Sequence, residues 1–171
     1  MTPDQIPPVA EHLLDSEELA ALIRVATGDG YTISLNAPGG SMRPFIRSGD
    51  KIFIAPVDQK SIRVGDILAF VRTPDGHVLA HRVVKLRDIL ILCKGDNVAE
   101  HDDGWIQFED VLGRVLKVQR DGQPVWMGPG LVKRFIARLS RRNKLVPMVS
   151  TLRRLKWGII SLFPSKDKSK S

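Results

Sequence analysis

The spacing of hydrophobic and polar residues predicts a helix near the start of the chain. Asp15 and Glu18 have the separation of a capping box, in which each side chain bonds a backbone N–H at the start of a helix. Apolar residues then recur at helical spacing, at Leu19, Leu22, Ile23 and Ala26. The Gly-Asp-Gly sequence at 28–30 is typical of a helix end. We therefore expect an N-terminal segment, residues 1–30, that holds one short helix.

From position 31 the pattern changes to short apolar runs separated by turn-forming residues. The predicted strands cover residues 31–35, 51–55, 66–72, 77–85, 88–94, 111–119 and 124–127. Ser-Gly-Asp, Thr-Pro-Asp-Gly and Asp-Gly sequences separate several of them. Since no helical pattern lies between these runs, the sequence predicts a mainly β fold, with an antiparallel β domain over residues 31–127.

Residues 128–164 carry two predicted amphipathic helices that are rich in Lys and Arg. A Gly-Pro-Gly sequence at 128–130 predicts a hinge before them. The apolar face of the first comprises Leu131, Val132, Phe135, Ile136 and Leu139. The apolar face of the second comprises Leu145, Met148, Val149, Leu152, Leu155 and Ile159. Residues 165–171 are predicted to form a disordered end.

The net charge of +7 is distributed unevenly along the chain. Residues 131–171 contain 12 Lys and Arg and one acidic residue, whereas residues 1–130 contain 14 basic and 18 acidic residues. The mildly acidic body gives no reason to expect nucleic acid as a partner. An apolar face beside Lys and Arg is typical of membrane-surface helices, so residues 131–164 predict contact with an anionic membrane surface. The alternative is that these helices pack on the β domain with their charges solvated.

No targeting or membrane-spanning segment is visible in the sequence. The N-terminus lacks a basic region followed by an apolar one, and no apolar run approaches the roughly 20 residues of a span. We therefore expect no transmembrane helix, and a location in the cytoplasm or at the periphery of a membrane. The single cysteine, Cys93, cannot form an internal disulfide, and its apolar surroundings predict a buried structural residue.

Two separate segments supply a candidate nucleophile and a candidate base. Ser41 follows Gly39 and Gly40 and lies shortly before Pro44, in a bend that would expose its hydroxyl. His81 lies in a predicted strand, and histidine is the usual base for a serine hydroxyl at neutral pH. Taken singly, each has a simpler explanation as a loop serine or as a structural histidine.

Acidic residues further along could complete such a site. Asp96, Asp102 and Asp103 are candidates for orienting an imidazole, although aspartates in such sequences are more often turn residues. No tight spacing of His and acidic residues supports a metal site, and we expect neither a metal nor a cofactor.

The order of the motifs over residues 37–118 adds weight to these candidates. The chain contains Gly-Ser-Met-x-Pro, Ser-Gly-Asp-Lys, Val-Gly-Asp-Ile, His-Arg-Val-Val, Lys-Gly-Asp-Asn, Asp-Asp and Val-Leu-Gly-Arg-Val in that sequence. This succession resembles the signal peptidase I clan of serine peptidases (S24/S26 type), which also contains the LexA-like self-cleaving repressors. Bacterial leader peptidases carry lysine before Arg-Val-Val, whereas this chain has His81 there. It is therefore similar to the histidine-base branch, as in SipW-like and Sec11-like signal peptidases, in a short form without a transmembrane anchor.

The resemblance implies a signal-peptidase or LexA-like antiparallel β domain and a serine endopeptidase that acts on signal- or leader-peptide-like substrates. It implies Ser41 as nucleophile and His81 as general base. It implies Asp103 as the triad carboxylate, with Asp102 as the alternative, and Asp96 as a supporting carboxylate.

The resemblance also bears on the oxyanion hole. The backbone N–H of Ser41 is the implied donor. Family members often add the hydroxyl of a serine two residues before the nucleophile, where this chain has Gly39. Losing one oxyanion donor costs roughly 10²–10³ in rate.

Two other functions remain compatible with the sequence. A LexA-like self-cleaving regulator would carry a lysine base and cut itself at Ala-Gly or Cys-Gly, and neither dipeptide occurs here. A catalytically silent module could instead bind peptides by pairing them with the edge of a strand.

Overall fold

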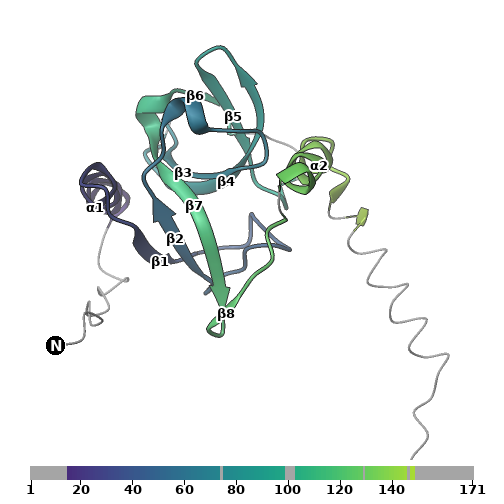
Figure 1. Cartoon of the computed structure of the whole chain (residues 1–171), viewed down its shortest axis with the longest axis horizontal. Coiled ribbons are helices and arrows are strands. Elements are labelled where there is room, and N and C mark those ends of the chain that lie inside the picture. Colours follow the sequence, from purple (N-terminus) through teal and green to yellow (C-terminus); the bar gives the residue numbers. More distant parts are fainter. Residues whose placement is uncertain (1–14, 74, 99–102, 129, 146, 149–171) are drawn as a thin grey trace, which may run out of the picture.

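A computed structural model describes residues 15–73, 75–98, 103–128, 130–145 and 147–148. These residues form a mainly β fold, as predicted from the sequence, with the helix α1 (Ser16–Gly28) before the sheet and the helix α2 (Gly130–Arg141) after it. The two helices lie on opposite sides of a strongly curved sheet (Figure 1).

The helix α1 begins and ends where the sequence predicts. The Asp15 side chain accepts hydrogen bonds from the backbone N–H groups of Glu17 and Glu18, at 2.9 and 2.8 Å, and the Glu18 carboxylate accepts from the Asp15 N–H at 3.1 Å. These contacts complete the predicted capping box. At the other end Gly30 has a φ of +86°, which favours glycine and lets the chain turn toward the first strand.

The sheet is antiparallel and has the order β1-β2-β7-β3-β4-β5-β6, with β8 paired to β7. Its strands are β1 (Ile33–Asn36), β2 (Lys51–Ala55), β3 (Ile67–Val71), β4 (Val78–Arg87), β5 (Leu90–Lys94), β6 (Trp105–Ile106), β7 (Val111–Arg120) and β8 (Gln123–Pro124). Two 3₁₀ turns, Gln59–Ser61 and Phe108–Asp110, lie in the connections.

The predicted strands correspond to observed ones, with three differences. The strand predicted at 88–94 begins at Leu90, because Asp88 adopts a φ of +52° in the turn after β4. The strand predicted at 124–127 is instead the short β8, which ends at Pro124. The two-residue strand β6 was not predicted, because so short a run carries no alternation of apolar and polar residues.

Two clusters of buried apolar side chains hold the fold together. The larger one joins Ile23 of α1 to residues of β1, β2 and β7 and to Met42 and Ile46 in the loop after β1. The smaller one, around Phe70 and Cys93, lies among β3, β4 and β5. Because Met42 and Ile46 flank the candidate nucleophile in sequence, burial of the loop in the larger core fixes its position.

The first predicted C-terminal helix is present as α2, but its buried face differs from the predicted one. Ile136 is buried as expected, together with Ala137 and Ser140, whereas Leu131 and Phe135 remain exposed. The second predicted helix and the predicted disordered end lie almost entirely outside the described residues. In the part of the chain that the structure describes, no helix has the length and apolar character needed to cross a membrane.

Candidate active site

Ser41 lies in the loop between β1 and β2, and backbone contacts fix both ends of that loop. The Ala37 N–H donates to the Asp50 carbonyl at 2.8 Å, and the Gly49 N–H donates to the Ala37 carbonyl at 2.9 Å. Beyond Ser41, the N–H groups of Phe45 and Ile46 donate to the Met42 carbonyl. The two ends of the loop are therefore hydrogen-bonded to each other where it leaves and rejoins the sheet. Ser41 lies between these contacts and the turn that begins at Met42.

His81 lies in the middle of β4, opposite Leu68 of β3. It is 4% exposed, and its ring makes a T-shaped contact with the Phe70 ring at a centroid distance of 6.3 Å. The strand and the aromatic contact together restrict the imidazole to one orientation.

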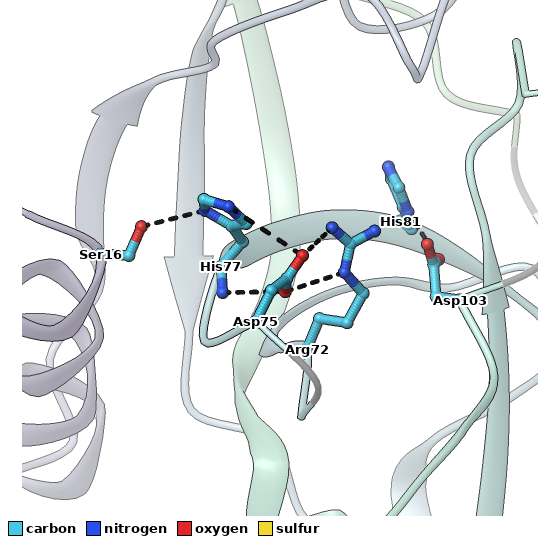
Figure 2. Close-up of polar contacts among 6 residues, drawn as sticks. All are labelled: Ser16, Arg72, Asp75, His77, His81 and Asp103. Carbon is cyan, nitrogen blue, oxygen red and sulfur yellow. Dashed lines mark hydrogen bonds and ion pairs between the residues drawn. The ribbon is translucent and has the colours of Figure 1, made fainter.

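Ser41, His81 and Asp103 form one hydrogen-bonded row. The His81 Nε2 lies 2.8 Å from the Ser41 Oγ, and the His81 Nδ1 lies 2.6 Å from the Asp103 Oδ2. Figure 2 shows the contact between His81 and Asp103. With Asp103 accepting from Nδ1–H, Nε2 carries the lone pair and can accept the proton of the serine hydroxyl. The arrangement suits activation of a hydroxyl by an oriented imidazole.

Asp103 reaches His81 from the segment between β5 and β6. Its backbone N–H donates to the Cys93 carbonyl at 3.0 Å, which holds the residue beside the end of β5. Its side chain is 9% exposed. The sequence left Asp102 and Asp103 as alternatives; Asp103 makes the contact, and Asp102 lies outside the described residues.

Asp96 contacts Arg82 rather than the imidazole. Its carboxylate accepts from the Arg82 Nε at 2.9 Å and from the Arg82 Nη2 at 2.7 Å, and both side chains are at most 1% exposed. The third nitrogen of the same guanidinium, Nη1, donates to the Gly65 carbonyl at 3.0 Å. If Asp96 supports the candidate site, it does so by holding the backbone of its neighbours, Gly95 and Asn97, in place.

That backbone touches Ser41 directly. The Asn97 N–H donates to the Ser41 carbonyl at 2.7 Å, and the Asn97 side chain donates to the Gly40 carbonyl at 3.3 Å. Gly95 lies so close that an added Cβ would be 2.9 Å from the Ser41 carbonyl oxygen and 3.2 Å from the His81 Nε2. The Lys-Gly-Asp-Asn motif thus holds the candidate nucleophile and base together, a role that sequence reasoning did not assign to Gly95 or Asn97.

The Ser-Gly-Asp motif supports the same loop from its far end. The buried Asp50 carboxylate accepts from the Arg47 N–H at 2.8 Å and from two nitrogens of Arg120 at 2.7 Å. Arg120 also donates to the Phe45 carbonyl at 3.2 Å. Burial acts to raise the pKa of Asp50, but the hydrogen bonds from Arg120 and Arg47 outweigh it and hold the pKa below its ordinary value.

The remaining candidates have structural surroundings. Cys93 is fully buried, as predicted, and burial followed by the charge of Asp103 raises the pKa of its thiol far above the ordinary value. His77 is exposed and lies in a separate surface cluster with Arg72, Asp75 and Ser16 (Figure 2). A hydrogen bond from Arg72 lowers the pKa of Asp75 to about 2.

An apolar pocket of about 870 Å³ adjoins Ser41 and His81. Its walls come from α1, from β1 and the loop after it, and from β2, β3 and β4. The lining includes Leu19, Leu22, Leu35, Met42, Ile52 and Ala80. The predicted apolar face of α1 therefore has two roles. Ile23 is buried in the core, and Leu19 and Leu22 contribute to the wall of this pocket. Within the described residues, no three His, Cys, Asp or Glu side chains are grouped as metal ligands.

The chain is similar in sequence to catalytic subunits of the signal peptidase complex. The catalytic subunit SEC11C of the dog (Canis lupus familiaris) and that of Homo sapiens are each 34% identical to it over 87 residues, 44% of this chain and 45% of the relative. A second human relative, described as the signal peptidase complex catalytic subunit SEC11B, is 34% identical over 105 residues. The match covers 54% of this chain and 61% of the relative. The chain thus spans about half the length of the relatives that it matches. No protein-family model matches it. Over about half of its length, the chain is a distant homologue of the Sec11 signal peptidase catalytic subunits.

Proposed function

We propose that this protein is a serine endopeptidase that cleaves signal- or leader-peptide-like substrates, with Ser41 as nucleophile and His81 as general base. The observation that carries the proposal is the row from Ser41 through His81 to Asp103, with distances of 2.8 and 2.6 Å. Homology to signal peptidase catalytic subunits supports the class of reaction.

The proposed reaction begins when the Ser41 Oγ attacks the carbonyl carbon of a peptide bond and its proton passes to the His81 Nε2. The resulting imidazolium is stabilised by Asp103 and then protonates the leaving amine, so that the C–N bond breaks and an ester remains on Ser41. A water then attacks the ester carbonyl and gives a proton to His81. His81 passes that proton to the Ser41 Oγ as the ester C–O bond breaks, which releases the acid product and restores the hydroxyl. The backbone N–H of Ser41 is the proposed donor to the oxyanion. Gly39 adds no side-chain donor, and its φ of +73° is one that a serine there would adopt only with strain.

The pocket supports an extended peptide with apolar side chains as the substrate. It adjoins the proposed nucleophile, and its lining is mostly aliphatic. The ladder between β4 and β5 starts at Arg82, so among the described strands residues 78–80 are paired only with β3. A substrate backbone could add to that edge and reach Ser41 with alternate side chains in the pocket.

Cleavage of a fluorogenic signal-peptide-like substrate tests the proposal. We expect cleavage by the wild type and a loss of at least about 10³-fold in kcat for Ser41→Ala and for His81→Ala. Ser34→Ala, at an exposed serine of β1, and His77→Ala, at an exposed histidine, are matched controls that should keep full activity.

Other outcomes would point elsewhere. Cleavage that survives Ser41→Ala would contradict the proposal. A wild type that cuts only its own chain, seen as a change in intact mass, would favour a LexA-like regulator. A wild type that binds the peptide with no turnover would favour a silent peptide-binding module.

A further inference from the structure

The orientation of α2 on the β domain is fixed by its buried face. Ile136, Ala137 and Ser140 are buried, and the helix packs mainly against β4. The Lys133 Nζ lies 3.7 Å from Asp66, and its backbone lies within 3 Å of where a side chain on Gly65 would begin. The helix therefore cannot turn its other face inward without losing these contacts.

The opposite face of α2 exposes large apolar side chains next to arginines. Leu131 is 78% exposed and Phe135 is 57% exposed, and Arg134 and Arg138 are exposed beside them. At 3.6 residues per turn, Leu131, Phe135 and Arg138 project within roughly 60° of one another. Single exposed apolar residues are ordinary, but two bulky ones on one helix face between cationic side chains are not explained by packing.

We propose that this exposed face of α2 binds the surface of an anionic lipid bilayer. Leu131 and Phe135 would enter the boundary between headgroups and acyl chains, and the arginines would extend to the phosphates. Charge complementarity identifies the partner, because residues 130–145 contain six Lys and Arg and no acidic residue. This surface is separate from the pocket beside Ser41, and the proposal does not depend on peptidase activity.

The same charge argues against a second copy of the chain as the occupant. Pairing two α2 faces would bring Arg134 and Arg138 of each copy against like charges, which disfavours association. A bilayer with acidic headgroups meets both requirements of the face, since it offers apolar depth and negative charge together.

Sedimentation of the full chain with vesicles tests the proposal. Binding is expected to vesicles of phosphatidylcholine and phosphatidylserine, with little binding to phosphatidylcholine alone. Phe135→Glu is expected to weaken binding by at least about tenfold. Replacing Arg134 and Arg138 together by Gln is expected to weaken binding roughly 25-fold, since each basic residue contributes about fivefold. Binding should also weaken in 1 M salt, where the Debye length is about 3 Å.

Leu116→Glu is the matched control, because Leu116 of β7 is 59% exposed and receives the same change of charge. Its vesicle binding should stay within about twofold of the wild type, and thermal unfolding should show that all the variants are folded. Equal binding of Phe135→Glu and wild type to anionic vesicles would overturn the proposal, as would binding that ignores phosphatidylserine. A wild type that dimerises through Phe135 and does not bind vesicles would assign the face to a second copy instead.

Discussion

Replacing Gly95 by alanine is expected to impair the proposed catalysis by displacing Ser41 from His81. The added methyl would be 2.8 Å from the Val98 Cγ2, 2.9 Å from the Ser41 carbonyl oxygen and 3.2 Å from the His81 Nε2. The nearest of these atoms belongs to the Val98 side chain. The Ser41 carbonyl is backbone, and the Asn97 N–H holds it at 2.7 Å.

The magnitude follows from how far these atoms must move. Ordinary carbon contacts begin near 3.5 Å, so the Ser41 carbonyl has to shift by roughly 0.5 Å relative to residue 95. The hydroxyl-to-imidazole distance is 2.8 Å, and a shift of that size in either partner takes it outside the range of a good hydrogen bond. Since a 1 Å misplacement can cost 10²-fold, we expect kcat to fall by roughly 10- to 100-fold. Overpacking should also lower the free energy of unfolding by about 1–3 kcal/mol.

The assay is steady-state cleavage of the same fluorogenic peptide, paired with thermal unfolding. Gly28→Ala is the matched control, because nothing lies within 4 Å of its added Cβ and its φ is not positive. It should keep the activity of the wild type. A folded Gly95→Ala protein whose kcat lies within twofold of the wild type would refute the argument that this glycine sets the spacing of Ser41 and His81.

Three further predictions concern the two buried aspartates, Asp50 and Asp96, and the pocket beside Ser41. Asp50 has a lowered pKa in the folded protein, so its contribution to stability is present above the unfolded pKa of about 3.9 and is lost as the pH falls through the folded pKa. Asp50→Asn should therefore flatten the acid limb of an unfolding titration and lower the free energy of unfolding at pH 7 by roughly 1.5–3 kcal/mol. Asp96→Ala should cost about 3–5 kcal/mol in denaturant unfolding, because it leaves the Arg82 charge buried without its partner. Leu22→Ala should enlarge the pocket and shift the ratio of kcat/KM toward peptides with bulkier apolar side chains by roughly tenfold.

Each of these has a contrary result. An acid titration with the same slope in Asp50→Asn would mean that another carboxylate controls the limb. Asp96→Ala as stable as an Arg82→Met, Asp96→Leu double variant would mean that the unpaired charge carries no penalty. An unchanged preference in Leu22→Ala, with normal activity, would mean that substrates do not reach the α1 wall of the pocket.

The order of secondary-structure elements was predictable because each depends on neighbours in the sequence. The capping box of α1 joins residues three apart, and strands such as β2 and β7 are short apolar runs bounded by turn residues. The partners of the buried aspartates were not predictable, since they come from across the sheet. Arg120 reaches Asp50 from 70 residues away, and nothing in the local pattern around Arg120 distinguishes it from a solvated arginine.

The candidate site also combines features that the sequence predicts with features that depend on the folded structure. Ser41 and His81 could be selected because their residue types and the order of the surrounding motifs indicate a chemistry. The choice between Asp102 and Asp103 depended on which way the chain runs after β5, and two adjacent acids carry no signal of that. Likewise, the contribution of α1 to the pocket depends on packing, because Leu19 and Leu22 have the spacing of any core-facing helix.

The adjacent pair His81 and Arg82 shows how the strand β4 supports the site from both of its faces. Successive side chains on a strand point to opposite sides, so His81 meets the Ser41 hydroxyl while Arg82 points away from it. Arg82 nevertheless acts on the same loop. Its guanidinium lies 5.2 Å from the centre of the Phe45 ring, four residues after Ser41, and it binds Asp96, whose neighbour Asn97 holds the Ser41 carbonyl. A lysine at position 82 would keep the charge but lose the planar fork that meets Asp96 and Gly65 together. A fully buried arginine next to the proposed base is therefore best understood as the anchor that keeps the nucleophile loop and the Lys-Gly-Asp-Asn segment in register.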